Sequence, residues 1–222
     1  MKTKAVIFDF DGTLTKPHKL PNSWARVWSK IDCLDEDEKY YSQFRNGEIT
    51  YREWLYLCYE CYKRENVCAK LFEDVAEEIE LVDYIEEFFK TLYDSNIKIY
   101  ILSGGVGNII DSKLAGLKKY ITSIEADTFL LDEAGKLCGV KESPSRLETK
   151  SYFVKSLLKD LNLNENEVVF VGNGCNDEEV YKAKVKTICV NPDKNAHPDN
   201  RTFWTYDMSD CKDIREILKF II

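Results

Sequence analysis

The sequence AVIFDFDGT, residues 5–13, joins a short apolar run to a polar stretch that is rich in turn-forming residues. A continuous apolar run with β-branched side chains at its centre is typical of a buried strand. The Asp-Gly pair that follows is common in turns. We therefore predict a buried strand that runs into a loop carrying two carboxylates, Asp9 and Asp11.

Three later segments repeat this pattern of an apolar run that ends in small and polar residues. They are residues 98–102 before Ser103-Gly104-Gly105, residues 167–171 before Gly172-Asn173-Gly174, and residues 187–190 before Asn191-Pro192. Apolar spacings of three and four predict helices over residues 82–94 and 150–161, and a C-terminal helix from Ser209 or Asp210. Alternating strands and helices predict an α/β fold, a Rossmann-like doubly wound parallel sheet with helices on both faces.

Residues 16–81 interrupt this alternation. They contain no convincing strand, several helical stretches and three of the four tryptophans. We predict a helical insertion after the first strand, so that residues 1–15 and 82–222 form the α/β core domain. Residues 128–140 predict a β-hairpin with a glycine in its turn.

Composition narrows the classes of partner. The 222 residues carry 31 basic and 39 acidic side chains, a net charge of −8 without a basic block, which argues against nucleic acid. No apolar stretch approaches the roughly 20 residues needed to span a bilayer, and the N-terminal apolar run is too short for a secretory signal. The eight cysteines are then expected to be free thiols in a reducing compartment, the cytoplasm.

Asp9 and Asp11 stand two residues apart at the end of a strand, a spacing that can aim both side chains at one point. Two adjacent carboxylates repel each other, so one can stay ionised while the other holds a proton. A carboxylate nucleophile beside an acid suits phosphoryl transfer through an aspartyl-phosphate. The alternative interpretation is a polar loop without chemistry.

Two features predict anion binding, each with a plain alternative. Ser103-Gly104 ends a strand and precedes a predicted helix, whose first N–H groups bind anions, although it is equally typical of a glycine-rich turn. Lys150 lies at a helix start, where a cation opposes the helix dipole, and a phosphate ligand would explain that position. Lys155 is the competing choice, and an ordinary exposed lysine is the alternative.

Asn173 and Asp177 offer oxygen ligands of the kind that Mg²⁺ prefers. The alternative is an Asn-Gly turn followed by a helix capped by Asn176 or Asp177. Cys58-x-x-Cys61 invites a zinc interpretation, but a closed zinc site needs four ligands, and we favour buried thiols there.

Asp9-Phe10-Asp11-Gly12-Thr13-Leu14-Thr15 resembles the first motif of the haloacid dehalogenase superfamily in its phosphatase form. Ser103-Gly104-Gly105, Lys150 and Gly172-Asn173-Gly174-Cys175-Asn176-Asp177 resemble the second, third and fourth motifs, in order. The Ser-Gly-Gly form, the insertion with Gly47-Glu48-Ile49-Thr50 and the hairpin are most similar to the phosphoserine phosphatase branch. The resemblance covers most of the chain.

The resemblance implies a phosphomonoesterase that uses Mg²⁺ and acts on a small phosphorylated metabolite. Asp9 would attack phosphorus and Asp11 would act as acid and then base. Ser103, the Gly104 N–H and Lys150 would hold the phosphoryl oxygens. Mg²⁺ would be bound by Asp9, the Asp11 backbone carbonyl and Asn173, with Asp177 at or behind the metal. Residues 16–81 would be the cap domain that closes over the substrate.

Three positions depart from the family pattern. Asn173 replaces the usual Asp, which keeps an oxygen but loses a charge. Ungapped alignment places His18 and Tyr56 where phosphoserine phosphatases carry a Glu and an Arg, so these two become the expected specificity residues and phosphoserine itself is doubtful. Cys175 lies in the fourth motif, where a thiol near a cation could be reactive, with space filling as the alternative.

Two alternatives to hydrolysis follow from the same residues. One is phosphoryl transfer to an alcohol, and the other is a binding or regulatory protein on a weakened phosphatase scaffold, which Asn173 favours.

Ten aromatic side chains between Trp24 and Tyr62 either pack the cap or hold an organic cation. The sequence names neither the substrate nor the oligomeric state.

Overall fold

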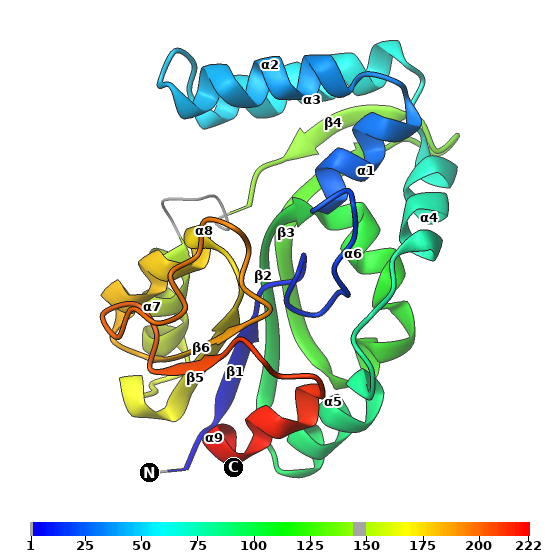
Figure 1. Cartoon of the computed structure of the whole chain (residues 1–222). Helices are drawn as coiled ribbons and strands as arrows, with labels where there is room; N and C mark the ends of the chain where they lie inside the picture. The colour runs from blue at the N-terminus through cyan, green and yellow to red at the C-terminus, as the bar shows by residue number, and fades with distance from the viewer. Residues whose placement is uncertain (1, 144–149) are drawn as a thin grey trace.

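The centre of the computed structural model, which describes residues 2–143 and 150–222, is a seven-stranded sheet (Figure 1). The strand order is β4-β3-β2-β1-β5-β6-β7, and every neighbouring pair is parallel except β3 and β4. The strands are β1 (Ala5–Phe8), β2 (Lys98–Val106), β3 (Ile121–Leu131), β4 (Leu137–Lys141), β5 (Val168–Gly172), β6 (Lys186–Val190) and β7 (Tyr206–Met208). This confirms the predicted Rossmann-like α/β sheet.

Alternation along the strands creates two hydrophobic layers. Val6 and Phe8 of β1 face one side of the sheet, and Ala5 and Ile7 face the other. On the first side, Phe8 packs against Phe88 and Phe89, with ring centroids 5.8 and 5.6 Å apart. Val154 and Leu158 cover the second side. Because both faces are covered, the central strands β1 and β5 are buried along their whole length and carry no polar side chain.

The α-helices also follow the prediction, with shifted ends. They are α1 (Ser23–Lys30), α2 (Leu34–Arg45), α3 (Tyr51–Arg64), α4 (Ala69–Glu78), α5 (Ile85–Asp94), α6 (Gly107–Lys113), α7 (Lys150–Asp160), α8 (Cys175–Glu178) and α9 (Leu218–Ile221). The expected C-terminal helix start at Ser209 or Asp210 is wrong, because β7 precedes those residues and helical structure begins only at Ile214. Within the described residues no helix is long and apolar enough to cross a membrane.

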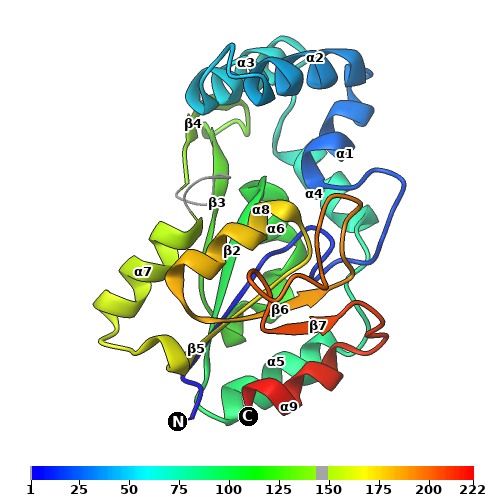
Figure 2. The ribbon, with the colours of Figure 1, turned by 60° about the vertical axis from the view of Figure 1, so that its left-hand side comes forward.

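The segment between β1 and α5 is helical, as predicted. It leaves and rejoins the core side by side, since Thr15 and Leu81 form an antiparallel bridge and Lys16 N–H donates to the Glu80 carbonyl over 2.8 Å. Both ribbon views place α2 and α3 beyond one end of the sheet (Figures 1 and 2). In contrast, Phe72 of α4 stacks on Phe129 of β3 at 5.6 Å, so the hydrophobic core continues into the insertion.

The predicted hairpin over residues 128–140 is present as β3 and β4. The Asp132 carboxylate accepts hydrogen bonds from the N–H groups of Ala134 and Lys136, both over 2.9 Å. Gly135 follows with φ of +74°, a conformation that side chains disfavour. These local bonds set the turn and carry β4 back beside the insertion.

Helix α3 begins with a capping box, and replacing Thr50 shows how much this box stabilises the protein. The Thr50 hydroxyl accepts from Glu53 N–H over 3.2 Å, and the Glu53 carboxylate accepts from Thr50 N–H over 2.7 Å. Thr50→Ala should lower the free energy of unfolding by about 1 kcal/mol in urea titration. Thr50→Ser keeps the hydroxyl and should stay near wild type; an equal loss in both variants would contradict this account.

Candidate active site

The polar strand ends meet at one edge of the sheet. In register, Phe8 of β1 pairs with Ile101 of β2 on one side and with Val171 of β5 on the other. The residues after these positions therefore emerge together, as expected at the carboxyl ends of parallel strands. This brings Asp9, Ser103 and Asn173 to one place.

A buried ion triad lies at this edge. The Lys150 ammonium is 2.9 Å from Asp9 Oδ1 and 2.5 Å from Asp177 Oδ1, and Lys150 and Asp177 are fully buried. Burial opposes the charge on Lys150, but the two carboxylates outweigh it and raise the pKa of the lysine. Burial also raises the pKa of Asp9 to about 7, against the opposing charge of Lys150.

Asp177 also organises the loop after β5. Its Oδ2 accepts hydrogen bonds from the N–H groups of Asn173 and Gly174, over 2.9 and 3.0 Å. A Cβ atom at Gly172 would lie 2.6 Å from the Asp177 carboxyl carbon, so only glycine fits there. Asp177 therefore holds both the loop that carries Asn173 and the ammonium of Lys150.

Asp11 has a different set of partners from Asp9. Ser23, the first residue of α1, donates its N–H to Asp11 Oδ1 over 3.1 Å and its hydroxyl to Oδ2 over 2.8 Å. The same hydroxyl accepts from Val106 N–H over 2.9 Å. Burial raises the pKa of Asp11, while the bonds from Ser23 lower it. The sequence marks Ser23 only as the residue after a helix-capping Asn22, and its contact with Asp11 becomes visible only in the structure.

The Ser103 region differs from the expectation. Strand β2 continues to Val106 and α6 begins only at Gly107, so Ser103 and Gly104 do not lie at a helix N-terminus. The reason is that β2 keeps pairing with β3, where Val106 lies opposite Asp127. The Ser103 hydroxyl accepts from Gly105 N–H over 3.1 Å, and the Gly104 carbonyl accepts from Trp24 Nε1 over 2.8 Å.

The donor set around Asp9 fits a divalent cation. The carboxylates of Asp9, Asp11 and Asp177 lie close together, with Asp9 and Asp177 buried and Asp11 partly buried. Among the described residues one ammonium, that of Lys150, contacts two of them. The Asn173 amide lies beside them, with its Oδ1 3.3 Å from the Thr13 hydroxyl. Such a surplus of negative charge with oxygen ligands is the chemistry that Mg²⁺ prefers.

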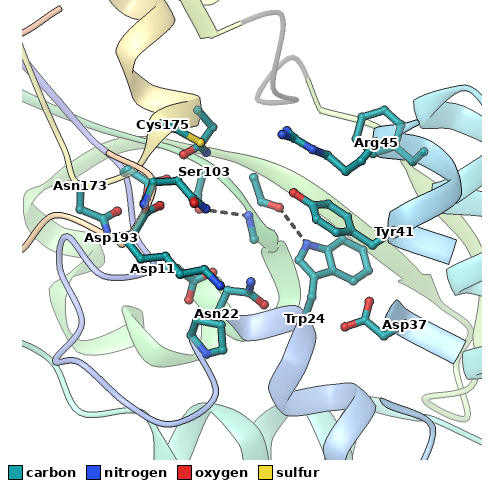
Figure 3. A pocket seen from close by; sticks show the side chains of 18 of the residues that line it. Asp11, Asn22, Trp24, Asp37, Tyr41, Arg45, Ser103, Asn173, Cys175 and Asp193 are labelled. Carbon is teal, nitrogen blue, oxygen red and sulfur yellow. Dashed lines mark hydrogen bonds between the residues drawn. The ribbon is translucent and has the colours of Figure 1, made fainter. Parts of the chain in front are cut away.

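A cavity of about 670 Å³ opens above these residues (Figure 3). Asp9, Asp11, Ser103, Gly104 and Asn173 line its core end. The other end is lined by aromatic side chains of the insertion, which are Trp24, Tyr41, Phe44, Tyr51 and Trp54. Neither Lys150 nor Asp177 lines the cavity. Lys150 is buried and contacts Asp9 and Asp177, so it reaches the site through Asp9 and does not face the cavity as a group that holds phosphoryl oxygens would.

The structure corrects the predicted specificity residues, His18 and Tyr56, since neither lines the cavity. His18 is exposed and its Nδ1 accepts from Leu20 N–H over 3.1 Å. Tyr56 is 56% exposed because it lies two residues from Trp54, on another face of α3.

The sequence profile of the haloacid dehalogenase-like hydrolase family matches residues 3–183. The chain belongs to the haloacid dehalogenase-like hydrolase family. This confirms the resemblance stated from the motifs. A search of curated proteins gave no match.

Solved structures with the same fold include a phosphoserine phosphatase with a phospho-aspartyl intermediate analogue, at 22% identity and a TM-score of 0.73 over all of both chains. A substrate-bound phosphoserine phosphatase complex has 21% identity and a TM-score of 0.74, also over all of both chains. A hydrolase of this family from Salmonella enterica serovar Typhi has 14% identity and a TM-score of 0.80, over all of this chain and 72% of that one. At these identities the likeness shows the shared fold.

The cysteines of this hydrolase are free thiols. Cys175 lines the cavity, but burial raises its pKa, which counts against a reactive thiolate. Cys61 lies near Cys33 and Glu36, the one group in the described ranges whose ligand atoms come close enough for a metal. Arg64 already binds that group, 2.6 Å from Glu36 Oε2 and 3.3 Å from Cys61 Sγ, so we assign no metal to it.

Replacing Lys150 tests the buried triad. Lys150→Met leaves Asp9 and Asp177 buried without their shared counter-charge, which should cost about 3–5 kcal/mol in the free energy of unfolding. Urea titration at pH 7 with a chelator, so that no metal compensates, measures this loss. Lys155→Met removes an exposed lysine of the same helix and should change stability by less than about 0.5 kcal/mol. Equal effects would contradict the triad.

Proposed function

We propose that this hydrolase is a Mg²⁺-dependent phosphomonoesterase that acts on a small phosphorylated metabolite through an aspartyl-phosphate on Asp9. The observation that carries the proposal is the division between the two carboxyl groups at the core end of the cavity. Asp9 contacts an ammonium, which favours the ionised form of a nucleophile. Asp11 has no cation in contact within the described residues, and its burial raises its pKa against the two bonds from Ser23, which favours the proton that an acid must hold. Different partners suit the two different roles.

In the first step, a carboxylate oxygen of Asp9 attacks phosphorus and the bond from phosphorus to the ester oxygen breaks. The protonated Asp11 gives its proton to the leaving oxygen, which departs as an alcohol. In the second step, Asp11 takes a proton from water, whose oxygen attacks phosphorus. The bond between phosphorus and Asp9 breaks, which releases phosphate and restores both carboxyl groups.

The remaining residues supply charge and position. Ser103 and the Gly104 N–H lie at the core end of the cavity, where they would donate to phosphoryl oxygens. Lys150 acts on the same region through its contact with Asp9. Mg²⁺ would be held by the Asp9 carboxylate, the Asp11 backbone carbonyl and the Asn173 side chain, with Asp177 behind them. When bound, it supplies positive charge that offsets the charge of the phosphoryl group.

We propose that residues 16–81 are a cap domain and that the core domain comprises residues 1–15 and 82–222. The bridge between Thr15 and Leu81 supports these boundaries, because the chain enters and leaves the insertion there. Closing such a cap over the cavity would exclude water from the first step. The free cysteines support a reducing compartment, the cytoplasm.

Phosphate release is the direct test of the proposed activity. With Mg²⁺, the wild type should hydrolyse p-nitrophenyl phosphate, and Asp9→Asn should lower kcat by about three orders of magnitude or more, because the nucleophile is lost. Beryllium fluoride with Mg²⁺ should bind the wild type and not Asp9→Asn. Retained turnover in the variant would exclude Asp9 as nucleophile. Release of a phosphorylated alcohol in place of phosphate, with an acceptor alcohol present, would indicate a phosphotransferase.

Asn173 gives a test of the metal ligands. Asn173→Asp adds a negative charge to an oxygen ligand, so the Mg²⁺ concentration for half-maximal activity should fall by roughly tenfold. Asn176→Asp adds the same charge to the neighbouring loop without a proposed ligand, and is the matched control. A requirement that stays the same or rises in Asn173→Asp, or that falls equally in both variants, would count against Asn173 as a ligand.

A further inference from the structure

Helix α2 of the insertion presents a row of side chains to the cavity. Asp37, Tyr41, Phe44 and Arg45 of α2 line it, at the spacings that place residues on one face of a helix. No residue of α2 is fully buried, and of this face only Phe44 packs, partly buried, against the hydrophobic core; Asp37, Tyr41 and Arg45 do not belong to it. The face therefore borders space that a ligand can fill.

Aromatic rings form a wall around this space. The Trp54 ring is central, with its centroid 4.9 Å from that of Trp24, 6.2 Å from that of Tyr41 and 6.0 Å from that of Phe44. In the described part of the chain, no lysine or arginine stacks on Trp24, Tyr41 or Trp54. The faces of aromatic rings attract cations, and Trp binds them best.

Asp37 supplies a charge without a partner. The described residues offer its carboxylate no hydrogen bond and no ion pair, although it lies only partly exposed in the cavity wall (Figure 3). Burial raises the pKa of Asp37 to about 6, so the side chain is still mostly ionised at pH 7. A half-buried carboxylate without a partner is destabilising, and a cation from a ligand would relieve that cost.

In the described part of the chain, the other charged side chains that line the cavity form no ion pair with Asp37. Lys19, Lys194 and Asp193 line it from segments outside α2 and α3. Arg45 is exposed and, in the view of Figure 3, lies on the opposite side of Tyr41 from Asp37. Arg45 therefore lines another part of the cavity wall than Asp37 does.

The aromatic wall continues into the reaction site. Trp24 Nε1 donates to the Gly104 carbonyl over 2.8 Å, next to Ser103. A group attached to a phosphate between Asp9 and Ser103 would therefore extend along Trp24 toward Asp37. The two ends of the cavity thus suit the two ends of one small molecule.

We propose that the substrate is an alkylammonium phosphate monoester, in which the cationic nitrogen lies against Trp24, Tyr41 and Trp54 with Asp37 as its counter-charge. This rests on the proposed function and specifies its substrate class. It assigns Asp37 as the residue that selects cationic over neutral alcohols. A neutral group of the same shape would leave the charge of Asp37 unpaired.

The test compares isosteric substrates. Choline phosphate and 3,3-dimethylbutyl phosphate have the same shape, but only the first carries a positive charge. The wild type should prefer choline phosphate by at least about tenfold in kcat/KM. Asp37→Asn should abolish most of this preference, whereas Asp35→Asn, which changes an exposed acid on the same helix, should keep it. Equal rates on both esters in the wild type, or an unchanged preference in Asp37→Asn, would overturn the proposal.

A second readout needs no turnover. Choline chloride should change the tryptophan fluorescence of the wild type, relative to sodium chloride at equal ionic strength, and Asp37→Asn should require a several-fold higher concentration. Binding of choline without hydrolysis of p-nitrophenyl phosphate would contradict the proposed function and keep the cation site. Hydrolysis of p-nitrophenyl phosphate without choline binding or cation preference would contradict the cation site and keep the proposed function.

Discussion

The buried ammonium of Lys150 is the contact on which the rest of the site depends. It lies between Asp9 and Asp177, and through Asp177 it is linked to the backbone of the loop that carries Asn173. In a low-dielectric interior, removing the shared cation would leave two carboxylates that repel each other. These two ion contacts of Lys150 therefore join the end of β1 and the loop after β5 to the start of α7, and they hold the proposed nucleophile in place.

Close backbone approaches make this arrangement possible. A Cβ atom at Gly12 would lie 2.2 Å from Asn173 Nδ2, and one at Gly105 would lie 2.6 Å from both Asp11 and Ser23. The glycines of the motifs thus have a steric role beside the carboxylates, because they let side chains from separate strands reach one point. Ser23 then couples the insertion to the core, since it touches Asp11 and the end of β2 at once.

The cavity has a polar half and an aromatic half, which come from different parts of the chain. The core half is built at strand ends, which are rigid because they pair on both sides. The insertion half is built on helices α1 to α3, with aromatic rings and Asp37, which forms no ion pair within the described residues. If the proposed chemistry lies on the sheet and the proposed recognition lies on the separate helical segment, specificity can vary without disturbing the nucleophile.

By itself, the sequence determined the alternation of strands and helices, the helical insertion and the meeting of Asp9, Ser103 and Asn173 at one edge. Apolar periodicity and turn residues act over a few neighbours, so these features are legible locally. Only the tertiary structure decided that Lys150 contacts Asp177, that Ser23 holds Asp11, and that Asp37 replaces His18 and Tyr56 in the cavity wall. Those are contacts between residues far apart in the chain, and they depend on how each helix is rotated when it packs.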